Sequence, residues 1–238
     1  NIWRAPTDND RNIRKAWEAA GYDCTRPRVY RVTVSEENGK VRIRCELSLA
    51  AVYRQRILTL DTEITVDGAG RVDIAYSGKR ETRMPYLPRF GVRAFLPQSM
   101  DRAEYFGFGP YESYIDKRRA STLGRYTTTA ARNHEDYIKP QENGSHYGCD
   151  YVRVQNAQGA GLLSFGAAPI SFNLSPYTQE ELTEKAHNYE LVPSGCTVLC
   201  LDHAVSGIGS NSCGPRLLPQ YAFSPETFEG TLTLVPFA

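Results

Sequence analysis

The sequence has few methionines and tryptophans, no excess of charge of one sign and no long apolar run. Its 28 basic and 27 acidic side chains leave a formal net charge of +1. This balance produces no sustained field toward nucleic acid or an anionic membrane. No run approaches the roughly 20 apolar residues that cross a bilayer, and the start at Asn1 lacks the regions of a signal peptide. We expect neither nucleic acid nor a membrane as a partner.

The cysteine pattern argues against a structural zinc site. The six cysteines are scattered, with no Cys-x-x-Cys pair, at positions 24, 45, 149, 196, 200 and 213. Cys196 and Cys200 fall on one expected strand, where their spacing of about 13 Å is too long for a disulfide. We expect reduced, mostly packed thiols and no metal site in this chain.

Other catalytic and cofactor motifs are also missing. Gly107-Phe108-Gly109 and Gly207-Ile208-Gly209 lack the third glycine of a dinucleotide loop, and we interpret both as tight turns. The four histidines form no metalloprotease pattern. His134-Glu135-Asp136 is interpreted as a solvated polar loop, and no Gly-x-Ser-x-Gly elbow indicates a serine hydrolase.

A two-residue alternation of apolar and polar side chains is the clearest pattern present. It runs through Val41–Leu49, Leu58–Val66 and Val72–Tyr76, as strands with one buried face require. Asn and Gly between these runs, at 37–40 and 67–70, supply the positive φ of tight hairpins. The first half is therefore predicted to be an antiparallel meander.

The second half has shorter strands and long loops. Further strands are expected at Tyr151–Val154, Gly161–Phe165, Thr197–Asp202 and Thr231–Val235. Helix is expected only in two pieces. One spans Ile13 to Ala20 and ends at Gly21, and the other follows a capping box at 178–181. The chain is predicted to be a single all-β domain over residues 1–238.

Two stretches combine carboxylates with aromatic or polar loop residues, as sugar sites do. They are Tyr105–Tyr114, which contains Glu112, and Lys139–Gly144, which contains Glu142. The alternative is that each glutamate fixes its loop by binding backbone N–H groups or arginines. The segment Arg4–Asp10 is equally open, because it also suits a turn and a helix cap.

Taken in order, these motifs resemble the C-terminal small-chain domain of bacterial lactose-type β-galactosidases of glycoside hydrolase family 2. The resemblance covers almost the whole chain. It rests on Arg-Ala-Pro-Thr-Asp-Asn-Asp at 4–10, Trp-Glu-Ala-Ala-Gly at 17–21, Phe-Gly-Phe-Gly-Pro-Tyr-Glu-Ser-Tyr at 106–114, Pro-Gln-Glu-Asn-Gly at 140–144, Phe-Asn-Leu-Ser at 172–175 and Gly-Ile-Gly at 207–209.

The resemblance implies a β-supersandwich similar to galactose mutarotases. It also implies that the two catalytic glutamates of a retaining glycosidase lie in a (β/α)₈ barrel elsewhere in the parent chain. This domain then has no catalytic residues and no cofactor, and the Mg and Na of the parent enzyme bind outside it. Its implied partners are the barrel, the galactoside and further subunits of a homo-oligomer.

The candidate sugar-binding residues are Arg4, Asn9, Glu142, His187, Asn211, Ser212 and Cys213. In the resembling family, a tryptophan that forms part of the galactose pocket stands where this chain has Cys213. A thiol offers much less stacking surface than an indole. We therefore expect pocket shaping rather than strong galactose binding.

Two alternatives remain open. The domain could bind galactosides by itself on a concave sheet face, or it could catalyse aldose mutarotation with a His acid and a Glu base. The compartment is cytoplasmic or periplasmic, and we favour the cytoplasm.

Overall fold

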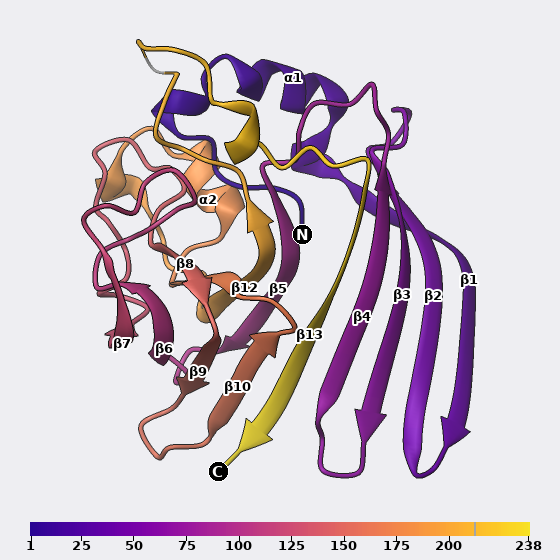
Figure 1. Ribbon diagram of the computed structural model, residues 1–238. Coiled ribbons are helices and arrows are strands. Elements are labelled where there is room, and N and C mark those ends of the chain that lie inside the picture. Colours follow the sequence, from indigo (N-terminus) through magenta and orange to yellow (C-terminus); the bar gives the residue numbers. More distant parts are fainter. Residues whose placement is uncertain (212) are drawn as a thin grey trace.

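Two antiparallel sheets form the computed structural model of the chain, which describes residues 1–211 and 213–238 (Figure 1). The larger sheet has nine strands. In spatial order they are β1 (Arg26–Glu37), β2 (Lys40–Ala50), β3 (Leu58–Asp67), β4 (Val72–Arg80), β13 (Thr227–Phe237), β10 (Gly161–Gly166), β9 (Tyr151–Gln155), β6 (Arg102–Gly109) and β7 (Thr122–Thr129). The smaller sheet has the order β5 (Arg89–Pro97), β12 (Cys196–Val205), β11 (Ile170–Ser175) and β8 (Ser145–Cys149).

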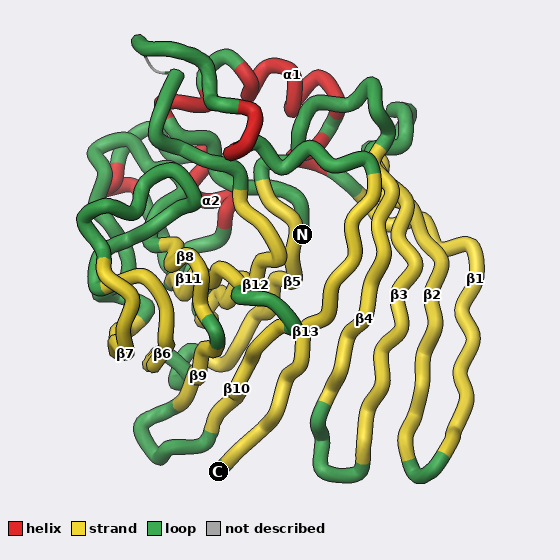
Figure 2. The backbone as a smooth tube through the Cα atoms, viewed as in Figure 1, coloured by secondary structure: helices red, strands yellow, loops and turns green. Residues whose placement is uncertain are grey.

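Helices are short and lie with the longer loops toward one end of the sheets (Figure 2). They are α1 (Ile13–Ala20), α2 (Gln179–Glu184) and the 3₁₀ turns η1 (Asp8–Asp10), η2 (Tyr22–Cys24), η3 (Asn188–Glu190) and η4 (Pro219–Tyr221). The predicted all-β class with few short helices is confirmed. No helix in residues 1–211 or 213–238 is long and apolar enough to cross a membrane.

The predicted meander of the first half is confirmed. Strands β2, β3 and β4 follow one another with continuous antiparallel registers. Asn38 and Gly39 adopt φ values of 53° and 70°, which close the β1–β2 hairpin. Gly70 has φ 82° in the β3–β4 hairpin. These positive values are the reason the turn sequences carry Asn and Gly.

The burial expected for this meander is only partly present. Val41 is exposed and Ile43 is half-buried, although the alternation predicted one buried face. The reason is that the four-stranded sheet covers only part of the nine-stranded one. Ser48, expected on the polar side, is buried under Tyr30, whose hydroxyl lies 2.9 Å from the Ser48 hydroxyl.

Strand β1 was not among the predicted strands. Its register with β2 shifts between Val29 and Arg31, so an extra residue breaks the alternation of side chains. The same bulge explains why the two-residue pattern does not run through this segment.

The prediction of a tight turn at Gly107–Gly109 was wrong, because these residues belong to strand β6. A Cβ on Gly107 would come within 2.4 Å of the Cys149 sulfur, and one on Gly109 within 2.4 Å of the Tyr105 hydroxyl. Close packing, not turn geometry, therefore requires these glycines.

Both predicted helix ends are present. Gly21 caps α1 in the left-handed region, with φ 78°. Thr178 caps α2 by accepting a bond from the Glu181 backbone N–H at 3.0 Å, and this helix ends at Glu184. The buried indole of Trp17 on α1 donates to the Tyr86 carbonyl at 2.8 Å and so joins α1 to the sandwich.

The apolar core has two main parts. One lies between the two sheets and includes Phe172, Leu199 and Leu232. The other lies under α1 and the N-terminal segment, where Trp3 and Trp17 share a cluster with Leu58 and Leu60 of β3. Of the cysteines, Cys149 and Cys200 are buried, Cys45 and Cys196 are partly exposed, and all six are unpaired. Cys24 and Cys213 are exposed, so the thiols are unpaired as expected but only two of the six are buried.

Candidate functional site

The motif segments meet at one rim of the sandwich, and Arg4 joins two of them. Its guanidinium donates to the Asp10 carboxylate, from Nη2 at 2.7 Å and from Nε at 3.1 Å. It also donates to the carbonyls of Ser206 and Gly207. Because Arg4 has no exposed surface, its role in this structure is to fix segment 4–10 against segment 206–207.

Glu142 joins the segment 140–144 to the same centre. Its carboxylate accepts bonds from Arg89 Nη1 at 2.8 Å and from the Ala5 backbone N–H at 3.2 Å. Arg89 in turn makes two bonds with Asp202, of 3.0 and 2.6 Å. Burial raises the pKa of Glu142, and the positive charge of Arg89 opposes that rise.

The segment Gly207–Gly209 is held by a carboxylate on the loop after β6. Asp116 accepts the backbone N–H groups of Ile208 and Gly209, at 3.0 and 2.8 Å. The Asn9 side-chain amide donates to the Ile208 carbonyl. A Cβ on Gly207 would lie 2.5 Å from the Asp116 carboxylate, so this close approach needs glycine. The prediction of a tight turn at 207–209 was wrong, because residues 207 and 208 are irregular backbone after β12 and Gly209 lies in a bend.

Glu112 has a structural environment similar to that of Glu142. Its carboxylate accepts the Gly144 backbone N–H at 3.0 Å and the Tyr137 hydroxyl at 2.6 Å, and it pairs with Lys117. Burial and the Glu112 carboxylate raise the pKa of Tyr137. Of the two interpretations of these glutamates, the geometry supports loop fixation for both.

The buried His146 is bonded to Asn133, and Asn133 in turn holds the 140–144 segment. The Asn133 side-chain NH₂ donates to the carbonyls of Gly144 and Leu174, at 2.7 and 3.1 Å, so its carbonyl oxygen faces His146. That oxygen lies 2.7 Å from His146 Nε2, which must therefore carry the proton. His146 Nδ1 then accepts from the Tyr105 hydroxyl at 2.9 Å. Burial lowers the pKa of His146 to about 4.

A pocket of about 520 Å³ opens where these segments meet. It is lined by Thr7, Asp8, Asn9, Asp116, Lys117, Tyr137, Gln141, Glu142, Ile208 and Gly209. Carboxylate, amide, ammonium and phenol groups share this wall, and such groups bind the hydroxyls of a polyol. The volume is in the range of small-molecule sites. We take this rim pocket as the candidate functional site.

The predicted site residues differ in their relation to the rim pocket. Asn9 and Glu142 both line it, although Glu142 is only 2% exposed, whereas the fully buried Arg4 can act on a ligand only through the segments that it fixes. Asn211, with φ 88°, and exposed Cys213 lie just beyond Gly209 on the same loop. Ser212 lies outside the described residues.

His187 lies outside the pocket lining. Its half-exposed ring stacks on Tyr189, with centroids 5.1 Å apart. The neighbouring Asn188 backbone N–H donates to the Ile138 carbonyl at 2.9 Å, one residue after Tyr137. A sugar contact by His187 stays a prediction.

Sequence reasoning missed Asp116, Lys117 and Tyr137. Asp116 and Lys117 follow the aromatic-glycine motif by two and three residues, and Tyr137 follows the His-Glu-Asp stretch directly. Proximity to these motifs was the only available signal, because nothing local shows that the loops fold toward each other.

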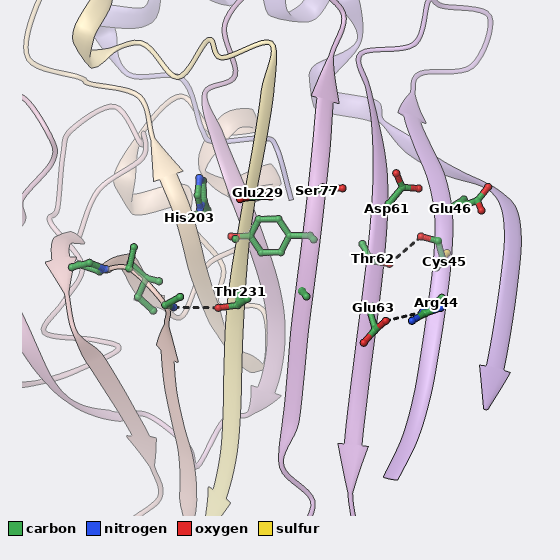
Figure 3. Close-up of a pocket in the computed structure, with 17 residues that line it drawn as sticks. Arg44, Cys45, Glu46, Asp61, Thr62, Glu63, Ser77, His203, Glu229 and Thr231 are labelled. Atoms are coloured by element: carbon green, nitrogen blue, oxygen red, sulfur yellow. Dashed lines mark hydrogen bonds and ion pairs between the residues drawn. The ribbon is translucent and has the colours of Figure 1, made fainter. Parts of the chain in front are cut away.

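A second hollow, of about 850 Å³, lies on the inner face of the large sheet (Figure 3). Tyr76 from β4 and His203 from β12 face it, with ring centroids 5.7 Å apart. Burial lowers the pKa of His203 and raises that of Tyr76 to about 12. Within the described residues, no group of three or more His, Cys, Asp or Glu side chains is placed to hold a metal ion.

The fold and the rim pocket define an antiparallel sandwich domain whose loops build a polar site. The chain belongs to the beta galactosidase small chain family, whose model matches residues 1–234.

Similar curated proteins carry the same description. The chain is 49% identical over 235 residues to a beta-galactosidase of Actinobacillus pleuropneumoniae, and this match covers 99% of the chain and 23% of the relative. It is 36% identical over 234 residues to a beta-galactosidase of Staphylococcus xylosus, covering 98% of the chain and 23% of the relative. The chain thus spans about a quarter of the length of these relatives.

Among solved structures, the chain is similar to galactose 1-epimerase from Lactobacillus acidophilus NCFM. The TM-score is 0.49 and the identity 12%, over 90% of this chain and 66% of the other. The likeness concerns the fold alone and says nothing about activity.

Proposed function

We propose that this chain is the C-terminal domain of a retaining β-galactosidase that hydrolyses terminal β-D-galactosides such as lactose. The observation that carries the proposal is the rim pocket, in which the family motifs at 4–10, 140–144 and 207–209 meet. The beta-galactosidase relatives, of which this chain spans about a quarter, supply the substrate class.

The domain contributes a pocket wall and not the catalytic pair. A retaining glycosidase needs two carboxyl groups about 5 Å apart with free access to the sugar. Glu142 is buried, and Glu112 is held by Gly144, Tyr137 and Lys117. The hydrolytic pair therefore belongs to a (β/α)₈ barrel in the rest of the parent chain, where the Mg and Na of the enzyme also bind.

The segment that contains Asn211 and Cys213 follows the pocket residue Gly209 directly in the sequence. Asn211 and Cys213 extend from the anchored Gly209. With a thiol in place of a stacking ring, this loop shapes the pocket and contributes little stacking to galactose. The polar side chains that line the pocket then supply the contacts to sugar from this domain; they include Asn9, Asp8, Lys117, Tyr137 and Gln141.

The direct experiment assays the purified 238-residue chain and the longer parent protein on a chromogenic β-galactoside. The parent should hydrolyse it with retention of configuration, and the isolated chain should show no turnover above background. Substantial turnover by the isolated chain would place the catalytic pair within these residues.

The concave hollow favours one second candidate, a galactoside-binding site on the domain itself. Tyr76 offers a ring, and His203 and Thr62 offer polar groups, in a space of about 850 Å³. Galactose or lactose should then shift the resonances of these residues in a saturable manner. If tens of millimolar sugar causes no shift, this candidate is rejected. A polarimetric assay tests aldose mutarotation: an unchanged rate of mutarotation in the presence of the chain rejects that activity.

The proposal extends to the oligomeric state and the cellular compartment of the parent protein. We expect a homo-oligomer, for which this domain supplies subunit contacts. The six unpaired cysteines support a reducing compartment, hence the cytoplasm rather than the periplasm. Fractionation of the native organism, followed by the activity assay, tests the location.

A further inference from the structure

The part of the large sheet made by β1, β2 and β3 presents an uncovered apolar face. The registers place Val34, Ile43, Ile64 and Ile74 in one row across the strands, and Val41 and Val66 in the next. Residues directly opposite in an antiparallel pair project to the same side. We call this surface the wing face; it comprises Val32, Val34, Val41, Ile43, Ile64 and Val66.

The wing face is more exposed toward the edge of the sheet. Val34 is 67% and Val41 41% exposed, whereas Ile74, nearer the small sheet, packs against the core. The small sheet ends at β5, so it covers the β13 side and leaves β1 to β3 open (Figure 1). Every residue of β1 is exposed.

The opposite face of the same strands is polar. Arg44 pairs with Glu63 at 2.7 Å, Arg42 with Glu63 at 3.3 Å and Arg31 with Glu46 at 3.5 Å. These pairs lie in solvent, as is usual for the outer face of a half-buried sheet. One side of these strands is charged and the other is aliphatic. An exposed aliphatic surface of this kind indicates that it is covered in the intact protein.

We propose that the wing face is the docking surface for part of the parent chain outside these 238 residues. The occupant is an apolar, convex segment that also enters the neighbouring hollow of about 850 Å³. About three quarters of the length of the relatives lies outside the matched region. A tethered surface has a high effective concentration, which favours contact within one chain.

Shape argues against a second copy as the occupant. A two-fold interface joins the same patch on both subunits, so the patch must complement itself. The wing face borders a hollow on the same side of the sheet, and one concave surface does not fill another. The inference rests on the proposed function only in taking this chain as one domain of a longer protein.

Cysteine labelling of the full parent protein tests the inference. Val34→Cys places a thiol on the wing face, and Thr33→Cys, one residue earlier, places a matched thiol on the polar face. Each native variant is pulsed with a maleimide, and the labelled peptide is identified by mass. Val34→Cys should react at least about tenfold more slowly than Thr33→Cys, and the two should react alike after denaturation.

Equal labelling rates in the native parent would overturn the proposal. Protection that disappears on hundredfold dilution of the protein would overturn it too, because it would indicate a second copy. Galactosidase activity, measured separately on the unmodified parent, tests the proposed function independently.

Discussion

Replacing Arg89 with methionine should be among the most damaging single substitutions in this chain. Arg89 is fully buried and forms bonds with two buried carboxylates, Asp202 and Glu142. Methionine keeps much of the volume but leaves both carboxylates without their cation. Breaking a buried pair by removing one partner costs about 3–5 kcal/mol.

The loss is measurable as a change in unfolding. In a chain of this size, each kcal/mol lowers Tm by about 2–4 °C, so Arg89→Met should lower it by roughly 6–20 °C. Arg71→Met is the matched control, because its pair with Asp73 is half-exposed. Exposed pairs contribute at most about 1 kcal/mol, so the Tm of Arg71→Met should stay close to that of the unmodified chain.

The dependence on pH and on the partners tests the cause. The deficit of Arg89→Met should shrink as the pH falls, because burial raises the pKa of Glu142, and without Arg89 this carboxylate loses its charge more readily in the folded state than in the unfolded state. Adding Glu142→Gln and Asp202→Asn should recover part of the loss. A deficit below about 1 kcal/mol at pH 7, or one equal to that of Arg71→Met, would refute the argument from buried charge.

Three further outcomes are expected. The chain should lose about 3 kcal/mol of unfolding free energy between pH 6.5 and pH 4, because His146 is protonated at a higher pH in the unfolded state than in the folded state. Urea unfolding at a series of pH values should show a flatter dependence of this free energy on pH for His146→Gln. Asp116→Ala frees the N–H groups of Ile208 and Gly209 and should lower the kcat/KM of the parent for galactosides about tenfold, with a small change in Tm; an unchanged kcat/KM would contradict the anchoring role. Cys213→Trp should lower the KM of the parent about two- to tenfold by adding a stacking ring, and an unchanged or higher KM would count against a sugar-facing loop.

Much of the fold could be predicted from local pattern. Alternation and Asn-Gly turns identified β2, β3 and β4, because both signals depend on near neighbours in the sequence. The β1 strand was missed because its bulge interrupts the period. The strand position of Gly107 was missed because only the packing of Cys149 against it, which is a tertiary contact, distinguishes it from a turn.

The site was predictable as a set of segments but not as a set of contacts. The resemblance indicated that segments 4–10, 140–144 and 207–209 matter, and the structure brings them together. It could not show that Arg4 and Glu142 are buried, because burial depends on the partners Asp10 and Arg89. Asp116 carries no local signal for its bonds to Ile208 and Gly209.

The central claim is that this domain shapes the sugar pocket of a β-galactosidase. Asn9→Ala in the full parent protein tests it most directly, with Asn156→Ala as control in an exposed turn outside the pocket. Steady-state kinetics on a chromogenic β-galactoside should show kcat/KM reduced about tenfold for Asn9→Ala and unchanged for the control, at equal Tm. An unchanged kcat/KM for Asn9→Ala would contradict the account.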